Sequence, residues 1–234
     1  MVGRIFFIIL FIGTIYFVSF WPVSAQGARD QSMISVFSPD EFGQYPHILR
    51  MMDQPAENFL QSVYRFVQYR HYYYGYPFYL YSALFAILPL KLFLDGGNTS
   101  QDMLMLRQMV SVLPMLLSLG LLVYMQTKFL KAGRSILMFV FLLSVPMVLI
   151  NNLWWHPESL ALLFVVLTLF FLQRDELSFG RDFYLAAVAC GLAVATKLIG
   201  LFFFLAIPVY IFLGWRQGRI DIRRAVQVAA VFVA

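Results

Sequence analysis

The sequence predicts an all-α, multi-pass bundle of membrane-spanning helices, and two observations carry that prediction. First, 61% of the 234 residues are apolar and 12% are charged, against about 25% charged residues in a soluble domain. Second, the charges are grouped, which leaves long stretches without Asp, Glu, Lys or Arg. This composition excludes a soluble globular enzyme and a disordered tail. The single cysteine, Cys190, excludes an internal disulfide scaffold.

Six apolar segments are predicted to cross the membrane, for which a helix needs about 20 apolar residues. They are 5–22, 104–126, 135–152, 158–172, 183–196 and 199–213. The shortest of them must be tilted or lie where the bilayer is thin. The last apolar run, 225–234, is about half a span. We therefore expect residues 1–234 to form one transmembrane domain that is the N-terminal part of a longer protein.

The first apolar run has two interpretations. Arg4, the apolar stretch and the small residues Val23-Ser24-Ala25 fit a cleaved signal peptide. A retained first helix is the interpretation that we favour in a multispanning protein. Both interpretations place residues 26–76, the first outer loop, outside the membrane.

The distribution of Lys and Arg predicts the orientation, because short cytoplasmic loops are rich in these residues. The segments 127–134, 173–182 and 214–224 together contain nine Lys and Arg. They share the cytoplasmic side only if the apolar segment 77–94 does not cross the membrane. With the net charge of +5 placed at the ends of apolar runs, a nucleic-acid partner is not expected.

Segment 77–94 is therefore predicted to be a re-entrant or interfacial helix on the outer side. Pro77 starts it, Pro89 and Lys91 interrupt it, and Asp95-Gly96-Gly97 ends it. The alternative is an ordinary span that obeys the charge rule imperfectly.

In this topology three sparse polar sites face outward together: the first outer loop, residues 151–158, and Thr196-Lys197. Ionisable residues at the membrane are costly and are functional candidates by default. Their convergence predicts an outward-facing active site.

Asp40 and Glu41 are the predicted catalytic residues, at the start of an amphipathic segment, 42–70. A carboxylate here can take a proton from an attacking hydroxyl. Consecutive helical residues point about 100° apart, so at most one of the two is expected to face the reaction. The alternative role for Asp40, or for Ser38, is to cap the helix that follows.

The aromatic sequence 69–77 supplies further candidates. Arg70 and His71, with Arg65, can bind a phosphate through charge-assisted hydrogen bonds. Tyr76 is a further outer-face candidate. The alternative is an aromatic belt at the membrane interface.

Three more outer-face candidates lie at the ends of apolar runs. His156 and Glu158 open a span, where Glu158 can also serve only to complement the helix dipole. Lys197 can neutralise a phosphate leaving group or simply extend to the interface. The chain has no P-loop, no GxGxxG, no HExxH and no Cys/His metal set.

Several of these segments, taken in order, resemble the GT-C glycosyltransferases, and more narrowly glycosyltransferase family 39, with its protein O-mannosyltransferase and aminoarabinose transferase branches. The acidic pair Asp40-Glu41 follows one N-terminal span, as in that family. The later landmarks are Tyr76-Pro77-Phe78-Tyr79-Leu80-Tyr81, Leu106-Arg107-Gln108-Met109-Val110-Ser111, His156-Pro157-Glu158 and Ala195-Thr196-Lys197-Leu198-Ile199-Gly200. The resemblance runs from about residue 38 to residue 213.

The resemblance implies a GT-C bundle with juxtamembrane helices in the first outer loop. It implies an inverting transfer of a sugar from a polyprenyl- or dolichyl-phosphate donor to a glycan, lipid or protein acceptor on the outer face. Asp40 would be the general base, and Arg70, His71 or Lys197 would bind the donor phosphate. No cofactor is implied with certainty, and a divalent cation is left open. A bacterial inner or plasma membrane is expected rather than the endoplasmic reticulum.

Two features depart from the family pattern. Tyr74-Gly75-Tyr76-Pro77 replaces the Glu-Lys-Pro-Pro of the aminoarabinose branch, so the phosphate-binding lysine of that branch is missing here. Glu158 stands where relatives often have Asp. The alternatives to a transferase are a lipid-linked sugar flippase or other transporter, and a non-catalytic membrane assembly protein.

Overall fold

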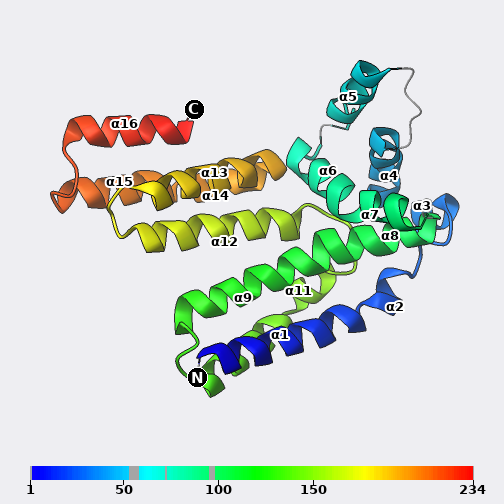
Figure 1. Cartoon of the computed structure of the whole chain (residues 1–234), viewed down its shortest axis with the longest axis horizontal. Helices are drawn as coiled ribbons and strands as arrows, with labels where there is room; N and C mark the ends of the chain where they lie inside the picture. Colours follow the sequence, from blue (N-terminus) through cyan, green and yellow to red (C-terminus); the bar gives the residue numbers. More distant parts are fainter. Residues whose placement is uncertain (1, 53–57, 72, 95–97, 234) are drawn as a thin grey trace. The chain divides into compact units, whose positions relative to one another are not determined.

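The computed structural model of the chain describes residues 2–52, 58–71, 73–94 and 98–233 (Figure 1). All regular elements in these ranges are helices, which confirms the predicted all-α class for the described part of the chain. The chain divides into two compact units, Met1–Leu160 and Ala161–Ala234, and each is described by itself.

The first unit contains most of the helices. They are α1 (Val2–Ser19), α2 (Trp21–Ser24), α3 (Gln31–Phe37), α4 (Pro39–Met52), α5 (Phe59–Val67), α6 (Tyr76–Ser82), η1 (Ala83–Ile87), α7 (Leu88–Phe93), α8 (Thr99–Leu106), η2 (Arg107–Val112), α9 (Leu113–Thr127), α10 (Ala132–Leu143) and α11 (Pro146–Asn151). Helix α12 (Glu158–Asp175) begins in this unit and continues into the second.

Three helices of the described chain are long and apolar enough to cross a membrane: Val2–Ser24, Tyr76–Phe93 and Thr99–Thr127. The first and third contain the predicted spans 5–22 and 104–126. The second matches the segment 77–94, whose length and composition are sufficient for a crossing. Its predicted position on the outer side therefore stays a prediction.

The predicted span 135–152 is divided into α10 and α11, which is a difference from the sequence prediction. Ser144 ends α10, and Val145 is extended, with φ −63° and ψ 125°, immediately before Pro146. A residue before proline is sterically disfavoured in the helical region, so the helix stops there and restarts at the proline.

Two π-helical segments, η1 and η2, lie in contact with each other near the polar end of the unit. Each is followed by a proline, Pro89 or Pro114, in the first turn of the next α-helix. The proline ring clashes with the carbonyl four residues earlier, and this carbonyl lies inside the π-helical segment in both cases. The predicted interruption at Pro89 and Lys91 is thus a widened turn before Pro89 within a continuous helix.

The first outer loop is largely helical, as predicted, with α4 and α5 replacing the single amphipathic segment 42–70. Tyr45 and Ile48 of α4 are buried in the core that also holds Phe78 and Trp155. Polar side chains cap neighbouring helices: Asp30 accepts from the Met33 N–H, and Asn98 forms a capping box with Gln101. The predicted helix end at Asp95-Gly96-Gly97 lies outside the described residues.

The second unit continues α12 and contains α13 (Arg181–Thr196), η3 (Leu198–Gly200), α14 (Leu201–Phe204), α15 (Ala206–Arg216) and α16 (Ile222–Val233). Glycines allow two close approaches in it. A Cβ on Gly214 would lie 2.4 Å from the Phe179 ring, and a Cβ on Gly200 would lie 2.7 Å from the Ala193 carbonyl carbon. Gly200 is therefore required sterically where the chain turns after α13.

Candidate functional site

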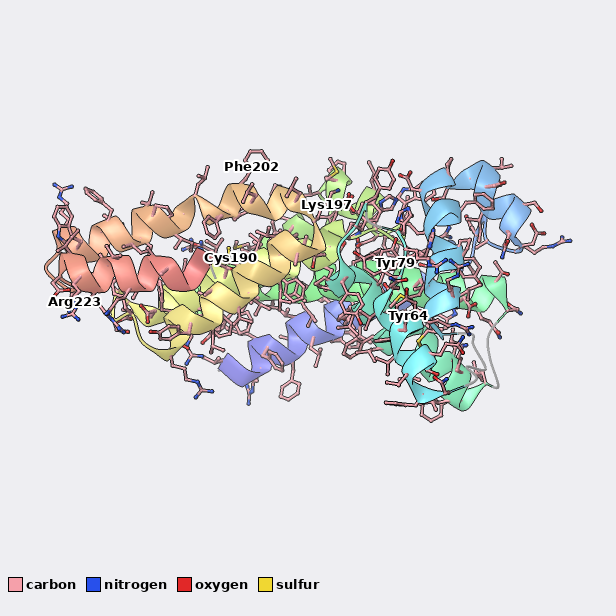
Figure 2. The ribbon with its side chains drawn as sticks, turned by 90° about the horizontal axis from the view of Figure 1, so that it is seen from above. Tyr64, Tyr79, Cys190, Lys197, Phe202 and Arg223 are labelled. Atoms are coloured by element: carbon pink, nitrogen blue, oxygen red, sulfur yellow. The ribbon has the colours of Figure 1, made fainter. Side chains whose placement is uncertain are left out.

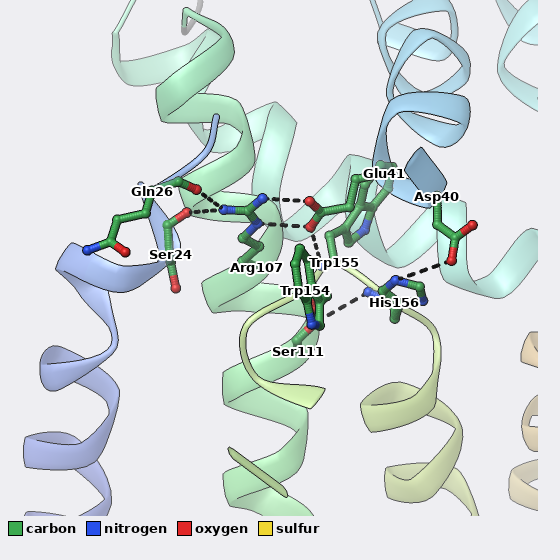
Figure 3. Close-up of polar contacts among 9 residues, drawn as sticks. All are labelled: Ser24, Gln26, Asp40, Glu41, Arg107, Ser111, Trp154, Trp155 and His156. Carbon is green, nitrogen blue, oxygen red and sulfur yellow. Dashed lines mark hydrogen bonds and ion pairs between the residues drawn. The ribbon is translucent and has the colours of Figure 1, made fainter. Parts of the chain in front are cut away.

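A buried ion pair between Glu41 and Arg107 organises the polar end of the first unit (Figure 3). Arg107 Nε lies 2.8 Å from Glu41 Oε1, and Arg107 Nη2 lies 2.5 Å from Glu41 Oε2. The Glu41 side chain is fully buried and the Arg107 side chain is 3% exposed. Two parallel bonds of this kind fix the orientation of both groups as well as their distance.

The third guanidinium nitrogen of Arg107, Nη1, binds the backbone at the end of α2 and just after it. Arg107 Nη1 donates to the carbonyl oxygens of Ser24 and Gln26, at 2.9 and 2.7 Å. Gln108 donates through Nε2 to the Ser24 hydroxyl at 3.0 Å. The carbonyl groups on the two sides of Ala25 thus bind the same guanidinium, and the choice between a retained helix and a cleaved signal peptide stays a prediction.

Glu41 also holds the connection 152–157 between α11 and α12. The Trp155 backbone N–H donates to Glu41 Oε1 at 2.6 Å, and the Trp155 indole N–H donates to the Ser82 hydroxyl at 3.0 Å. Ser111 donates to the Trp154 carbonyl oxygen at 2.5 Å. Two of the three predicted outer polar sites, the first outer loop and residues 151–158, are therefore brought together.

Asp40 lies beside this anchor but faces solvent. Its side chain is 70% exposed, and its Oδ2 lies 3.9 Å from His156 Nε2. The other ring nitrogen of His156, Nδ1, lies 3.6 Å from Glu158 Oε2. One imidazole thus stands between two carboxylates, and all three were predicted outer-face candidates.

The expected divergence of Asp40 and Glu41 is confirmed by their burial. Adjacent positions on α4 point one carboxylate into the unit and the other outward, so only Asp40 is open to a reacting group. Both acids also lie in the first turn of α4, where negative charge is favoured by the helix dipole. The contact that the structure gives the Asp40 carboxylate is with the His156 ring, not with a backbone N–H.

Tyr74 borders the same corner. Its ring packs edge-on against His156, with the ring centroids 6.3 Å apart. Burial, and then the negative charges of Glu158 and Asp40, raise the pKa of Tyr74 to about 12. Tyr74 is therefore a neutral phenol near pH 7, able to donate a hydrogen bond toward an anionic group.

The two residues predicted to bind phosphate, Arg70 and His71, lie in different surroundings. His71 Nδ1 lies 2.6 Å from the Tyr79 hydroxyl, and its ring lies 5.0 Å from His47. Burial, and then the neighbouring His47, lower the pKa of His71 below its usual value, so it is neutral near pH 7. Arg70 is exposed, with φ +58°, and lines a polar pocket on α4 and α5.

Tyr76 starts α6 within an aromatic cluster. Its ring lies 5.6 Å from Tyr69 and packs edge-on against Phe66. Phe78 stacks on Trp155 at 5.3 Å. Through Trp155, this packing connects the aromatic sequence 69–77 to Glu41. Much of the aromatic sequence is therefore part of a packed cluster.

Lys197 belongs to the second unit, where it ends α13 and is partly buried (Figure 2). Its backbone N–H donates to the Ala193 carbonyl oxygen at 3.0 Å, and the preceding Thr196 is fully buried. The convergence of Lys197 with the first outer loop stays a prediction.

Arg107 is the main residue that the candidate list missed. The sequence does contain a signal for it, because an arginine at the edge of a long apolar run is costly unless it is paired. Its partners at Ser24 and Gln26, by contrast, are backbone carbonyl groups, which any residue type supplies.

No metal site emerges from the described residues, among which no group of three or more His, Cys, Asp and Glu could hold an ion. Asp40 and Glu158 are separated by the His156 ring. We therefore derive no step through a divalent cation.

Comparison with known proteins gives no relative. No protein-family model matches the sequence, and neither curated proteins nor solved structures give a significant match.

Proposed function

We propose that the protein is an inverting membrane glycosyltransferase that uses a polyprenyl- or dolichyl-phosphate sugar. The observation that carries the proposal is the contrast between Asp40 and Glu41: an exposed carboxylate stands next to a buried one that is fully engaged. Glu41 is held by Arg107 and by the Trp155 N–H, so the backbone that carries Asp40 is fixed from two distant segments. Such preorganisation is what a general base needs.

In the proposed reaction Asp40 accepts the proton of an acceptor hydroxyl. The acceptor oxygen attacks the anomeric carbon of the donor, and the bond from that carbon to the lipid phosphate oxygen breaks. The lipid phosphate leaves with the electron pair, and the configuration at the anomeric carbon inverts. His156, between Asp40 and Glu158, would orient the Asp40 carboxylate, and the neutral Tyr74 would donate to an oxygen of the substrate.

The leaving phosphate requires positive charge, because stabilising charge that develops in the transition state is usually the largest catalytic contribution. His71 is neutral near pH 7, and Arg70 lines a pocket whose lining does not include Asp40. Lys197 belongs to the second unit, so its expected role at the leaving phosphate stays a prediction.

The test is the rate of transfer from a labelled polyprenyl-phosphate sugar in membranes that contain the protein. We expect Asp40→Asn to lower the rate by about 10²- to 10⁴-fold. Asp30→Asn is the matched control, because Asp30 is an exposed acid of the same loop and asparagine preserves its cap on α3.

Transfer by Asp40→Asn at the wild-type rate would defeat the general-base assignment. Movement of the labelled lipid across the bilayer without any transfer, in the wild-type protein, would favour the flippase alternative instead.

A further inference from the structure

An arginine-lined pocket lies where the end of α4 meets α5. Its lining residues in the described chain are Arg50, Tyr64, Arg65, Gln68 and Arg70, and its volume is about 250 Å³. Each of these side chains carries a hydrogen-bond donor, and three carry a positive charge. The described lining contains no carboxylate. We call this feature the arginine pocket.

The chemistry of the arginine pocket matches a phosphate. Guanidinium groups bind phosphate oxygens through paired, charge-assisted hydrogen bonds, and a neutral phenol and amide add further donors.

Helix α5, which carries Tyr64 and Arg65, also has an apolar face without cover. None of its nine residues is buried. Phe59, Val63 and Val67, four residues apart, are 80%, 42% and 55% exposed, and Leu60 beside them is 77% exposed. Phe66 points the other way and packs against the core.

The position of this apolar face next to the arginine pocket indicates what binds there. A short helix with one apolar face and cationic residues at its side is typical of a helix lying in the membrane interface. A face of nine residues is too small for a stable protein interface, which needs about 800 Å² on each partner. An anionic lipid surface satisfies both the apolar face and the charge.

We propose that α5 lies in the headgroup region of the bilayer and that the arginine pocket binds the phosphate of an anionic phospholipid. This site is separate from the Asp40 corner, and it does not depend on the glycosyltransferase proposal. Arg50, Arg65 and Arg70 hold the lipid phosphate, while Phe59 and Leu60 enter the acyl region below it.

The experiment uses the whole chain reconstituted in vesicles, with Phe59→Trp as a fluorescent reporter. The four native tryptophans are subtracted by measuring the parent protein in parallel. Lipids with brominated acyl chains quench the reporter on contact, and they are supplied either as phosphatidylglycerol or as phosphatidylcholine. We expect quenching by both and half-maximal quenching at a lower fraction of the anionic lipid.

Adding Arg70→Gln to the reporter should raise the half-maximal fraction of phosphatidylglycerol about fivefold, since one arginine at the membrane surface contributes about that factor. Arg29→Gln is the matched control, because Arg29 is an exposed arginine of the same loop outside the arginine pocket. It should leave the preference unchanged. Leu60→Trp provides a second reporter if Phe59→Trp alters the fold.

Three results would overturn the proposal. Equal quenching by the two lipids would remove the anionic phosphate from it, and no quenching of either reporter would place α5 outside the bilayer. An equal effect of Arg29→Gln and Arg70→Gln on the phosphatidylglycerol preference would mean that no lipid phosphate is held in the arginine pocket.

Discussion

The first and second units each contain a buried carboxylate that holds its surroundings, and the two differ in what they hold. Asp175 in the second unit accepts from the N–H groups of Phe179 and Gly180 and from the hydroxyls of Ser178 and Tyr210, at 2.8 to 2.9 Å. Three of these partners lie within five residues of Asp175, so the carboxylate stabilises one turn.

Glu41 instead joins segments that are far apart in sequence. Its partners Arg107 and Trp155 are 66 and 114 residues away, and Arg107 reaches on to the end of the first helix. Its neighbour Asp40 is left exposed at a fixed position. The bonds of Asp175 thus stabilise a local turn, whereas the bonds of Glu41 connect distant segments and also fix the exposed carboxylate beside it.

The largest effect on stability is expected from a substitution that breaks the ion pair between Glu41 and Arg107. Glu41→Gln leaves the Arg107 charge buried without a counter-charge, which should lower the free energy of unfolding by about 3–5 kcal/mol. Unfolding in mixed micelles, followed by denaturant titration, measures it. Replacing both partners, as Glu41→Leu with Arg107→Met, should recover most of the loss; a double variant as unstable as the single one would show that the pair itself is not the cause.

Removing the Asp175 carboxylate should have a smaller effect. Asp175→Ala removes the acceptor of two backbone N–H groups, so we expect the free energy of unfolding to fall by about 1–3 kcal/mol. Asp182→Ala is the control, because the Asp182–Arg174 pair is partly exposed and contributes at most about 1 kcal/mol. If Asp175→Ala and Asp182→Ala lower the free energy of unfolding equally, the turn does not depend on Asp175.

Asp175 should also make the stability of the fold depend on pH. Burial by itself would raise the pKa of Asp175, but hydrogen bonds from Gly180, Phe179, Tyr210 and Ser178 outweigh it and lower the pKa below its usual value. A carboxylate with a lowered pKa in the folded state stabilises the fold above its unfolded pKa, which is about 3.9. That contribution should disappear as the pH falls through the folded pKa, and Asp175→Ala should flatten the stability curve there. An unchanged curve would contradict the assignment.

The smallest effect is expected from Tyr74, the tyrosine that packs against His156. Because the pKa of Tyr74 is about 12, the residue acts only as a neutral donor near pH 7. Tyr74→Phe should lower the transfer rate by about tenfold or less, roughly one hydrogen bond, with no change in the pH profile between about pH 6 and 9. A shift of the profile in that range would mean that Tyr74 ionises during the reaction.

Residue patterns predicted the helical class and much of this corner. The helical period separated Asp40 from Glu41, and Pro77 and Pro89 marked a helix start and an altered turn, whereas the break before Pro146 was not predicted. The bond between Glu41 and the Trp155 N–H had no sequence signal, because every residue except proline carries that donor. The pairing of His71 with Tyr79 was hidden for a related reason, since the aromatic sequence offers several hydroxyls at similar spacing.

The free energy of unfolding of Asp40→Asn, measured on the same preparation as its transfer rate, tests whether Asp40 reacts while Glu41 holds it in place. We predict a free energy of unfolding within about 0.5 kcal/mol of wild type, as for an exposed side chain, together with the loss of transfer. A loss of several kcal/mol, comparable with Glu41→Gln, or full transfer activity would contradict the division of roles between the two carboxylates.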